Sequence, residues 1–358
     1  MDLFFYEYGL FLAKTITISL VIVFVVVILA ANAMRQRHHG KQEGNIVVTN
    51  LNDEMDRMKD DLRCEIIDEA LLKAEAKAEK QQDKVERKAR KKQAVSQDDE
   101  GKKRVFVLSF DGDARASAVE ELRHCISGVI AVARPEKDEV LLKLESPGGM
   151  VHAYGLAASQ LTRLRNAKLR LTIAVDLVAA SGGYMMACVA DRLIAAPFAY
   201  VGSIGVLVQL PNVHRLLKDN KIDYEMITAG EYKRTLTTFG ENTDKDREKV
   251  QEEVDEMHDL FKAHIAHYRP QIDISKVATG EVWTGQQALE LGLVDAIDVS
   301  DEWICSRLDE HDVFGVSWEY KKRLGEKIST LLEAGLSRAI DRVSFGWLQR
   351  AEKEKFFS

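Results

Sequence analysis

The sequence lacks the cysteine patterns that mark zinc and redox sites. None of its four cysteines forms a CxxC pair, and none stands at zinc-ligand spacing from a histidine. They are Cys64, Cys125, Cys188 and Cys305. We therefore expect four free thiols, and we predict neither a metal ion nor a cofactor for this chain.

The sequence also lacks an excess of positive charge. Its 50 Lys and Arg residues are outnumbered by 57 Asp and Glu residues, which gives a formal net charge of −7. No basic field would attract a nucleic acid, so nucleic acid is not expected among the partners. The 46% of apolar residues in 358 suffice for a sizeable core, in one large or two ordinary domains.

One segment has the length and composition of a transmembrane helix. Residues 15–34 contain no charged side chain and are long enough to cross a bilayer, where they would contact membrane lipid. A cleaved signal peptide is the alternative, but the positive residues lie mainly after the run and no small-residue cleavage site follows. We therefore expect a retained single-pass anchor. One positive residue precedes the run and three follow it, at positions 35, 37 and 41, which favours a cytoplasmic location for the rest of the chain.

Composition divides the chain into four regions. Residues 1–40 hold the expected anchor, and residues 41–103 are dense in helix formers and opposite charges, which predicts a charged helical stalk and a solvated linker. Residues 104–300 are the expected catalytic domain. Residues 301–358 are expected to form a C-terminal amphipathic helical extension, whose apolar stripe either packs on a neighbouring subunit, the commoner use, or lies on anionic lipid.

The region from residue 104 alternates between strand and helix patterns. Strand patterns cover residues 104–110, 138–145, 168–175, 191–196, 200–210 and 223–229. Helix patterns cover residues 117–133, 150–165, 213–220 and 243–268, and another begins after Ser181. Repeated strand–helix–strand units imply parallel strands covered by helices, so we predict an α/β fold.

Ser181 is the first candidate for chemistry. It follows a buried strand pattern and a turn of small residues, at the point where a helix pattern begins. A serine in this place either caps the helix through its hydroxyl or presents the hydroxyl as a nucleophile beside free backbone N–H groups. Capping is the commoner use, and the nucleophile pattern G-x-S-x-G is absent because Ala179 occupies its first position.

The segment LESPGG, residues 144–149, is a candidate for binding an oxyanion. Its proline and two glycines, between a strand and a helix, force a tight turn whose backbone N–H groups can face outward. A plain turn is the alternative interpretation. Together with the N–H of Gly182, beside Ser181, the segment would form a cradle for acyl transfer.

Two residues are candidates for the general base. His152 lies shortly after LESPGG, and histidine is the commonest base in enzymes. Lys233 lies in the segment GEYKR, after a strand pattern. A lysine acts as a base only when desolvation or a neighbouring cation lowers its pKa, so it needs a loop folded over an apolar site. The residues alone leave both candidates open.

Five separated motifs together resemble one family of enzymes. They are LESPGG, ASGGYMMA, DRLIAAPFAYVGSIGV, GEYKR and GEVWTGQQALELGLVDAI. Their types and order, over residues 104–300, resemble the signal peptide peptidase A family of serine peptidases. The resemblance implies the Clp/crotonase fold, a spiral of strand–strand–helix units, and assembly into a homo-oligomeric ring.

The resemblance also implies a role for each candidate residue. Ser181 is similar to the family's nucleophile, and Lys233, 52 residues later, is similar to its general base. Ser203 matches the hydroxyl that holds the lysine. Gly149 and Gly182 match the oxyanion donors.

One residue departs from the family pattern, and the family resemblance disagrees with the charge pattern on the side of the membrane. Glu145 stands where the family often has asparagine, at a strand end, so little effect on catalysis is expected. Family members that clear signal peptides work outside the cytoplasm of bacteria, against the charge bias around the expected anchor. The resemblance thus implies the bacterial inner membrane, and the side on which the catalytic domain lies stays open.

The features together predict a membrane-anchored serine endopeptidase with a Ser-Lys dyad. It would cleave peptides or unfolded membrane-proximal segments through an acyl-enzyme, with the substrate paired to a strand edge. Small apolar side chains would fit the Ala- and Gly-rich walls at the cleavage position. Two alternatives are a non-catalytic ring scaffold at the membrane and a crotonase-like enzyme for acyl-CoA thioesters, which needs neither Ser181 nor Lys233.

Overall fold

The computed structural model describes residues 11–12, 14–15, 17, 44–68, 71 and 102–320. No helix within these residues is long and apolar enough to cross a membrane. The expected anchor lies outside them except for Thr15 and Thr17, as do nearly all of the linker and most of the expected C-terminal amphipathic helix.

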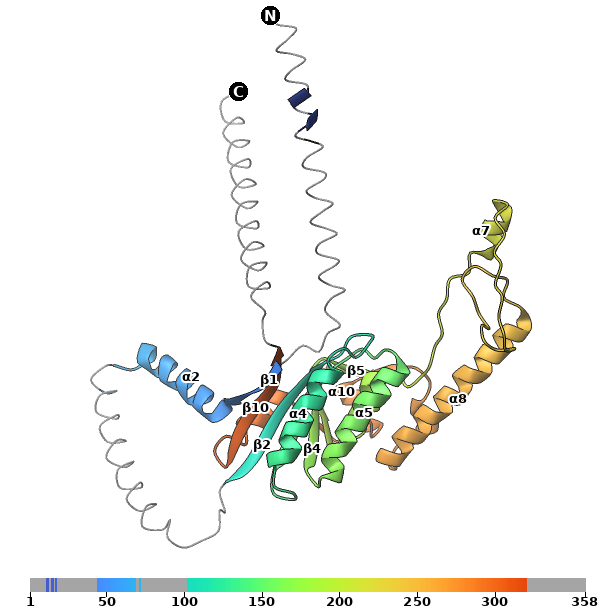
Figure 1. Cartoon of the computed structure of the whole chain (residues 1–358). Coiled ribbons are helices and arrows are strands. Elements are labelled where there is room, and N and C mark those ends of the chain that lie inside the picture. The colour runs from blue at the N-terminus through green and yellow to red at the C-terminus, as the bar shows by residue number, and fades with distance from the viewer. Residues whose placement is uncertain are drawn as a thin grey trace, which may run out of the picture. The chain divides into compact units, whose positions relative to one another are not determined.

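A seven-stranded sheet forms the centre of the described chain (Figure 1). In spatial order its strands are β1 (Gly44–Asn50), β10 (His311–Tyr320), β2 (Lys103–Asp111), β3 (Glu139–Glu145), β4 (Arg170–Val175), β6 (Arg192–Ala195) and β9 (Ala296–Ile297). Every pairing from β10 to β9 is parallel. The predicted α/β class with parallel strands is therefore confirmed. The helical patterns expected over residues 41–103 and 301–358 are wrong for β1 and β10, which come from these regions and join the sheet.

Helices bury both faces of the central strands, because successive side chains of a strand point to opposite faces. Val140 and Leu142 of β3 pack in the larger core, beneath α4 (Val119–Val132) and α5 (Val151–Asn166) (Figure 1). Leu141 faces the other way and packs near Trp303 of α11 (Ser300–Cys305). All three β3 side chains are fully buried, which explains why this strand reads as a continuous apolar run.

A small second sheet lies beside the ends of the large one and carries the candidate site. It consists of β5 (Val178–Ala180), β7 (Tyr200–Gly202) and β8 (Val282–Thr284). Strand β5 pairs in parallel with β7, which pairs antiparallel with β8. The chain passes from β4 to β5, and from β6 to β7, within a few residues, and α6 (Gly182–Ala187) begins just after β5.

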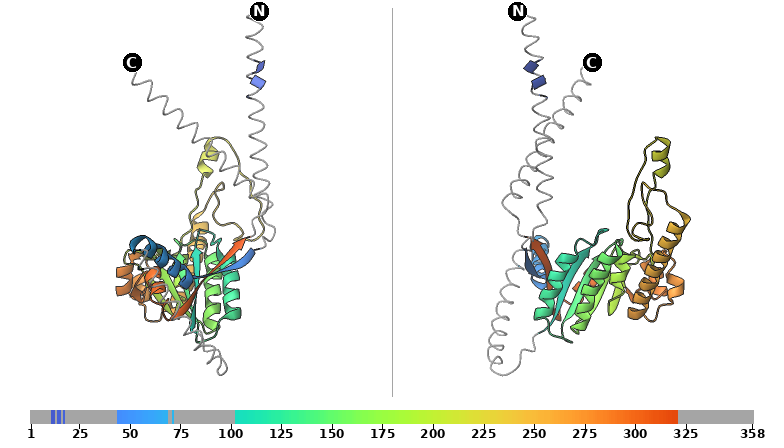
Figure 2. Two further views of the ribbon diagram at one scale, coloured as in Figure 1. Left: turned by 90° about the vertical axis from the view of Figure 1, so that its left-hand side faces the viewer. Right: turned by 45° about the vertical axis from the view of Figure 1, so that its right-hand side comes forward.

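After β7 the chain leaves the body as an extended arm, which we define as residues 206–243. The arm carries α7 (His214–Asp219) and returns through the long helix α8 (Asp244–Tyr268) (Figures 1 and 2). The strands expected over residues 200–210 and 223–229 are wrong beyond Gly202, since no strand forms there. Their alternating apolar pattern imitates a sheet strand, but these side chains lie on an arm without a neighbouring strand.

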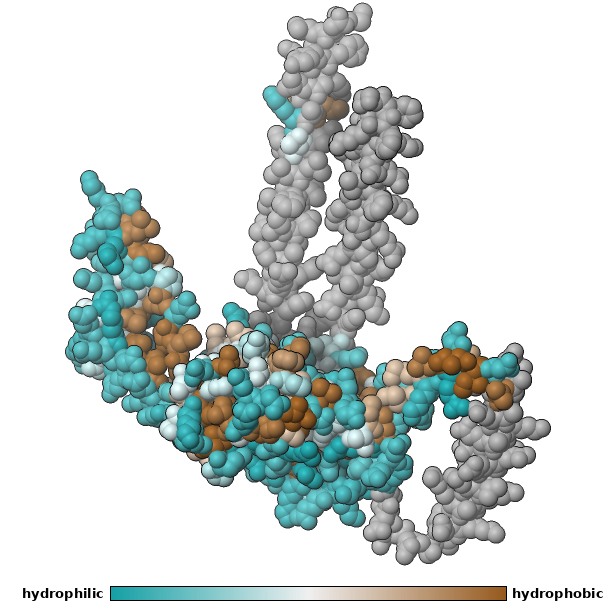
Figure 3. Space-filling model, turned by 180° about the vertical axis from the view of Figure 1, so that it is seen from behind, coloured by the Kyte–Doolittle hydropathy of each residue, from teal (hydrophilic) through white to brown (hydrophobic). Residues whose placement is uncertain are grey.

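Apolar side chains remain exposed along the arm (Figure 3). They are Leu207, Val208, Leu210, Leu216, Ile222, Tyr224, Met226, Ile227, Tyr232 and Phe239. The side chain of Ile227 is 98% exposed and that of Leu207 is 78% exposed. Residues of this kind on an element without a core of its own are typical of a surface that another chain covers.

Helix α2 (Leu51–Ile66) lies within the region 41–103, where a helical stalk is predicted. The side chain of Asn50 caps the helix by accepting hydrogen bonds from two backbone N–H groups of its first turn. The side-chain amide of Asn52 donates to the carbonyls of Leu308 and His311, and its oxygen accepts from the N–H of Val313. The first turn of the helix is thus tied to the sheet, whereas α2 itself contains no buried residue.

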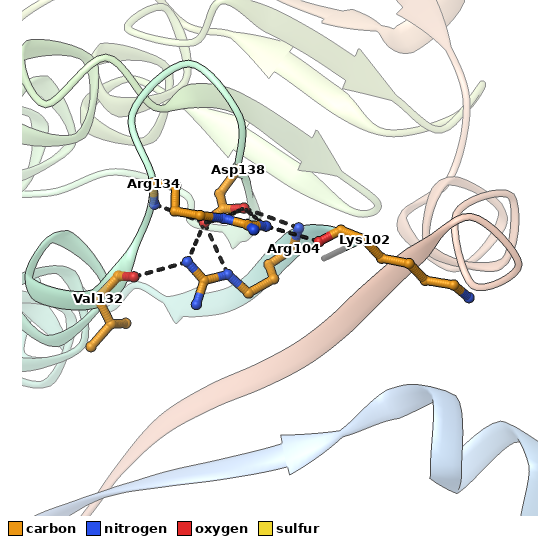
Figure 4. Close-up of polar contacts among 5 residues, drawn as sticks. All are labelled: Lys102, Arg104, Val132, Arg134 and Asp138. Carbon is orange, nitrogen blue, oxygen red and sulfur yellow. Dashed lines mark hydrogen bonds and ion pairs between the residues drawn. The ribbon is translucent and has the colours of Figure 1, made fainter. Parts of the chain in front are cut away.

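One buried carboxylate joins the start of β2 to the turn before β3 (Figure 4). Asp138, whose side chain is fully buried, accepts hydrogen bonds from the guanidinium groups of Arg104 and Arg134 and from both of their backbone N–H groups. Arg104 also donates to the carbonyl of Val132, and Arg134 to that of Lys102. This cluster fixes the amino-terminal ends of β2 and β3, whereas the segment LESPGG follows the carboxyl end of β3.

Candidate active site

Ser181 lies in a sharp turn between β5 and α6, with a backbone conformation that L-residues rarely adopt. Its φ is 52° and its ψ is −117°. Its N–H donates to the carbonyl of Gly202 at 2.7 Å, and its carbonyl accepts from Met185 at 3.0 Å. The side chain makes no capping hydrogen bond with the helix, so the commoner interpretation of this serine, as a cap, is wrong. Strain of this kind is typical of functional residues that the surrounding fold holds in place.

Two glycines with unbonded backbone N–H groups lie beside Ser181. Gly182 is the first residue of α6, where a helix leaves its N–H groups without intrahelical partners. Gly149 lines the same cleft as Ser181. The described residues provide no hydrogen-bond acceptor for the N–H of either glycine. The arrangement gives two free donors near one free hydroxyl, as stabilisation of an oxyanion requires.

A cleft of about 1140 Å³ opens in front of Ser181. Its walls come from the turns before α5 and α6, from the first residues of the arm and from α8. Ser203 also lines the cleft in a strained conformation with a φ of 51°, and its N–H donates to the carbonyl of Glu281 at 2.6 Å. The structure therefore brings together Ser181, Ser203, Gly149 and Gly182.

Lys233 is the predicted site residue that the structure does not place in the cleft. It lies on the arm, its side chain is exposed, and it does not line the cleft in front of Ser181. The other candidate base, His152, is exposed on α5 and does not line the cleft either.

Four residues of α8 line the cleft, and no sequence motif singles them out. Besides Val254 they are the polar residues Gln251, Asp255 and His258. The amide of Gln251 donates to Asp255 at 2.8 Å, and Nε2 of His258 lies 3.3 Å from the carbonyl oxygen of Ile204, next to Ser203. In the sequence these residues belong to an ordinary charged helix. Only the return of α8 along the cleft gives them a place near Ser181.

A smaller pocket adjoins Ser181 and measures about 10 Å³, roughly the space of one water molecule. Its lining is mostly apolar and consists of Gly149, Val151, Ser181, Gly182, Met185, Gly205, Val206, Met257 and Phe261. A side chain that enters this pocket can be little larger than a methyl group unless the lining moves.

Comparison with known proteins identifies the family to which this chain belongs. Residues 3–161 match the N-terminal region of peptidase family S49, and residues 163–313 match peptidase family S49 itself. The chain belongs to peptidase family S49. A probable protease SohB of Haemophilus influenzae is 47% identical over 340 residues, which cover 94% of this chain and 95% of that protein.

Further members of family S49 are similar over shorter stretches. A probable protease SohB of Buchnera aphidicola is 49% identical over 244 residues, 68% of this chain and 72% of that protein. A putative signal peptide peptidase SppA of Enterococcus faecium is 28% identical over 165 residues, 46% of this chain and 48% of that protein. The expected resemblance to the signal peptide peptidase A family is thus confirmed, and a peptidase function follows for this member of family S49.

The cysteines of this S49 peptidase do not contribute to the cleft. All four are free thiols, as predicted, with Cys64 and Cys305 exposed and Cys125 and Cys188 buried. Burial raises the pKa of Cys125 to about 11 and raises that of Cys188 even further, so neither buried thiol ionises near neutral pH. Within the described residues, no group of three or more His, Cys, Asp or Glu side chains could hold a metal ion.

Proposed function

We propose that this chain is a serine endopeptidase in which Ser181 is the nucleophile and Lys233 is the general base. The observation that carries the proposal is the conformation of Ser181, which is strained and makes no capping bond. Ser181 also lines a cleft and lies beside Gly149 and Gly182, whose N–H groups are free. A serine that only ended a strand would need neither the strain nor the free donors.

The exposed position of Lys233 is explained when the base comes from a neighbouring copy of the chain. The arm carries Lys233 away from its own body and exposes many apolar side chains. If the arm of one copy covers the cleft of the next, these side chains become buried and the lysine amine is removed from water. Desolvation favours the neutral form of a lysine, as a base requires. A head-to-tail contact of this type produces a ring when the rotation from one copy to the next closes.

The reaction then proceeds in two steps. The neutral amine of Lys233, held by the hydroxyl of Ser203, takes the Ser181 proton while Oγ bonds to the peptide carbonyl carbon. The N–H groups of Gly149 and Gly182 stabilise the oxyanion, the C–N bond breaks, and the lysine ammonium gives its proton to the departing amine. Water, deprotonated by the same lysine, then attacks the acyl-enzyme, and Ser181 leaves with the proton.

The cleft also suggests the form of the substrate. The backbone N–H groups of Val206 to Leu210 have no acceptor among the described residues, so an extended peptide could pair with this segment as an added strand. The small pocket beside Ser181 would then take the side chain before the cleaved bond. We propose extended or unfolded segments with alanine or glycine at that position as substrates.

The proposal places the enzyme at the bacterial inner membrane, with residues 15–34 as its single anchor and the Clp/crotonase spiral as its fold. Support comes from the uncharged run, from bacterial S49 relatives and from the alternation of strands between two sheets. Flanking charge favours the cytoplasmic side, and the family resemblance favours the other. Protease accessibility of the stalk in spheroplasts distinguishes the two orientations.

The test mixes two inactive variants of the full-length chain. Ser181→Ala and Lys233→Met should each abolish cleavage of an internally quenched peptide, whereas Lys218→Met, also on the arm, should not. Co-assembly of equal amounts of the two inactive variants should restore about a quarter of the activity, because one contact in four then joins an intact serine to an intact lysine. Unchanged activity of both single variants would refute the dyad, and inactive mixed rings would refute the supply of lysine by a neighbour.

A further inference from the structure

A chain of buried hydroxyl groups lies directly beneath the turn that carries Gly149. The side chain of Ser146 is fully buried, and so is that of Tyr154 on α5. Their oxygens are 2.5 Å apart. Ser146 Oγ also accepts a hydrogen bond from the N–H of Gly148 at 3.0 Å, and Tyr154 Oη donates to the carbonyl of Asp113 at 2.7 Å.

Only one direction of hydrogen bonding satisfies all of these contacts. A carbonyl oxygen only accepts, so the single hydroxyl proton of Tyr154 goes to Asp113. Ser146 must therefore donate to Tyr154, and its own oxygen accepts from Gly148. Each donor therefore has one acceptor, and the hydrogen bonds run from the Gly148 N–H to Ser146, from Ser146 to Tyr154 and from Tyr154 to the Asp113 carbonyl. Because burial raises the pKa of Tyr154, its phenol keeps this proton at neutral pH.

Ser146 and Tyr154 also lie against the beginning of α6. A Cβ atom on Gly182 would collide with the ring of Tyr154, and one on Gly183 would lie 2.6 Å from the carbonyl oxygen of Ser146. A Cβ atom on Gly112 would lie 2.6 Å from both the Ser146 and the Tyr154 hydroxyl oxygens. Ser146 and Tyr154 therefore leave no room for a side chain at Gly112, Gly182 or Gly183.

We propose that Ser146 and Tyr154 are positioning residues for the oxyanion donors, because the hydroxyl chain fixes the turn of Gly148 and Gly149 against the start of α6. The Gly148 N–H is held inward, and the next N–H along the chain, that of Gly149, is left free on the cleft wall. The inference rests on the proposed function, in which Gly149 and Gly182 bind the oxyanion.

A positioning role predicts a specific kinetic signature. Donors that act only on the transition state change kcat without changing substrate affinity. Tyr154→Phe keeps the ring that packs on Gly182 and removes one hydroxyl. In the full-length chain it should lower kcat about tenfold toward an internally quenched peptide with alanine before the cleaved bond, with KM unchanged.

The double variant provides a second test. Ser146→Ala removes the acceptor of the Gly148 N–H and should also lower kcat about tenfold. Because both hydroxyls act through one chain, Ser146→Ala combined with Tyr154→Phe should cost little more than the stronger single variant, far less than the hundredfold expected of independent sites. A loss of kcat in the double variant that equals the product of the two single losses would overturn the proposed coupling.

Tyr184→Phe is the matched control. Tyr184 is also fully buried, and its hydroxyl donates to the carbonyl of Leu293 at 2.9 Å, away from the cleft. This variant should lower Tm as much as Tyr154→Phe does and leave kcat unchanged. Equal kcat in the two phenylalanine variants, or a loss in Tyr154→Phe through KM alone, would overturn the positioning role.

Labelling of Ser181 by a fluorophosphonate separates this inference from the proposed function. Loss of labelling in Ser181→Ala with slower labelling in Tyr154→Phe supports both. Unchanged cleavage by Ser181→Ala would remove the proposed function itself. If Ser181→Ala is inactive and unlabelled while Tyr154→Phe is labelled and cleaves at the wild-type rate, only the positioning role fails.

Discussion

Gly148 lies against Ser181, and no side chain fits between them. A Cβ atom on Gly148 would stand 2.7 Å from the Cβ of Ser181 and 2.8 Å from the backbone nitrogen of Gly182. The φ of Gly148 is 91°, a region that L-residues rarely adopt. Two turns that are separated by more than thirty residues in the sequence therefore meet at one serine, and the contact depends on a hydrogen atom in place of a side chain.

Gly148→Ala should abolish peptidase activity. The methyl group would push the LESPGG turn away from Ser181, and the positive φ would add about 1–2 kcal/mol of strain to the folded state. We expect a loss of at least a hundredfold in kcat, measured with a quenched peptide, because a displaced donor is as harmful as a missing one. The control is Gly155→Ala on α5, where a Cβ atom meets nothing within 4 Å. This variant should be fully active and more stable by up to about 1 kcal/mol, since alanine is the better helix former.

Met257→Ala should change the side chain that the enzyme accepts before the cleaved bond. Met257 lines the small pocket beside Ser181. Its truncation widens the pocket, so kcat/KM should rise for peptides with valine or leucine at that position relative to those with alanine, by about tenfold. A set of quenched peptides that differ in one residue measures this ratio. Leu260→Ala, also on α8 but 64% exposed and outside the pocket, should leave the ratio unchanged. An identical ratio in both variants would contradict the assignment of the pocket.

The Asp138 cluster should make the folded state sensitive to acid. Burial alone would raise the pKa of Asp138, but hydrogen bonds from Arg134 and Arg104 outweigh it and lower the pKa from 3.8 to about 2. A carboxyl group with a lower pKa in the folded than in the unfolded state stabilises the fold at pH values above its unfolded-state pKa. This stabilisation is lost as the pH falls from about 4 to about 2. The contribution amounts to at most about 2 kcal/mol.

Urea unfolding between pH 2 and pH 7 measures this effect. Asp138→Asn should be less stable at pH 7 by about 3 kcal/mol, since two arginines lose their buried partner, and should lose this part of the acid sensitivity. Glu120→Gln removes an exposed ion pair with Arg123 and should change stability by less than about 0.5 kcal/mol. Parallel pH profiles of the wild type and Asp138→Asn would contradict the role of this carboxylate.

Local patterns in the sequence predicted the parts of the site that local structure determines. The turn at residues 144–149, the helix of residues 244–268 and the place of Ser181 between strand and helix follow from turn residues and periodicity. The strands expected on the arm are wrong because the same alternation of apolar residues occurs whether a sheet buries them or, as here, they stay exposed. The alternation of apolar residues does not tell whether their side chains are exposed to solvent.

Other parts of the site depend on contacts that no local pattern contains. Tyr154 is an ordinary apolar position of a helix until the bridge between Ser146 and Ala179 sets the two turns side by side. His258 lies near Ser203 only because α8 returns along the cleft. The role of Lys233, taken from family resemblance, stays a prediction, because its proposed partner belongs to another copy of the chain.

The arm should therefore control both assembly and activity. Ile227 is 98% exposed on the arm, and the proposed ring buries it. Ile227→Asp places a charge in that interface, which should disperse the ring to smaller species in sedimentation analysis and reduce peptide cleavage at least tenfold. Because Ile227 lies outside the core of the described chain, any decrease in Tm should come only from the loss of the interface between copies. Lys218→Asp, on the same arm, removes no apolar surface and should leave both assembly and cleavage nearly unchanged. A fully assembled and active Ile227→Asp variant would show that this part of the arm lies outside the interface between copies.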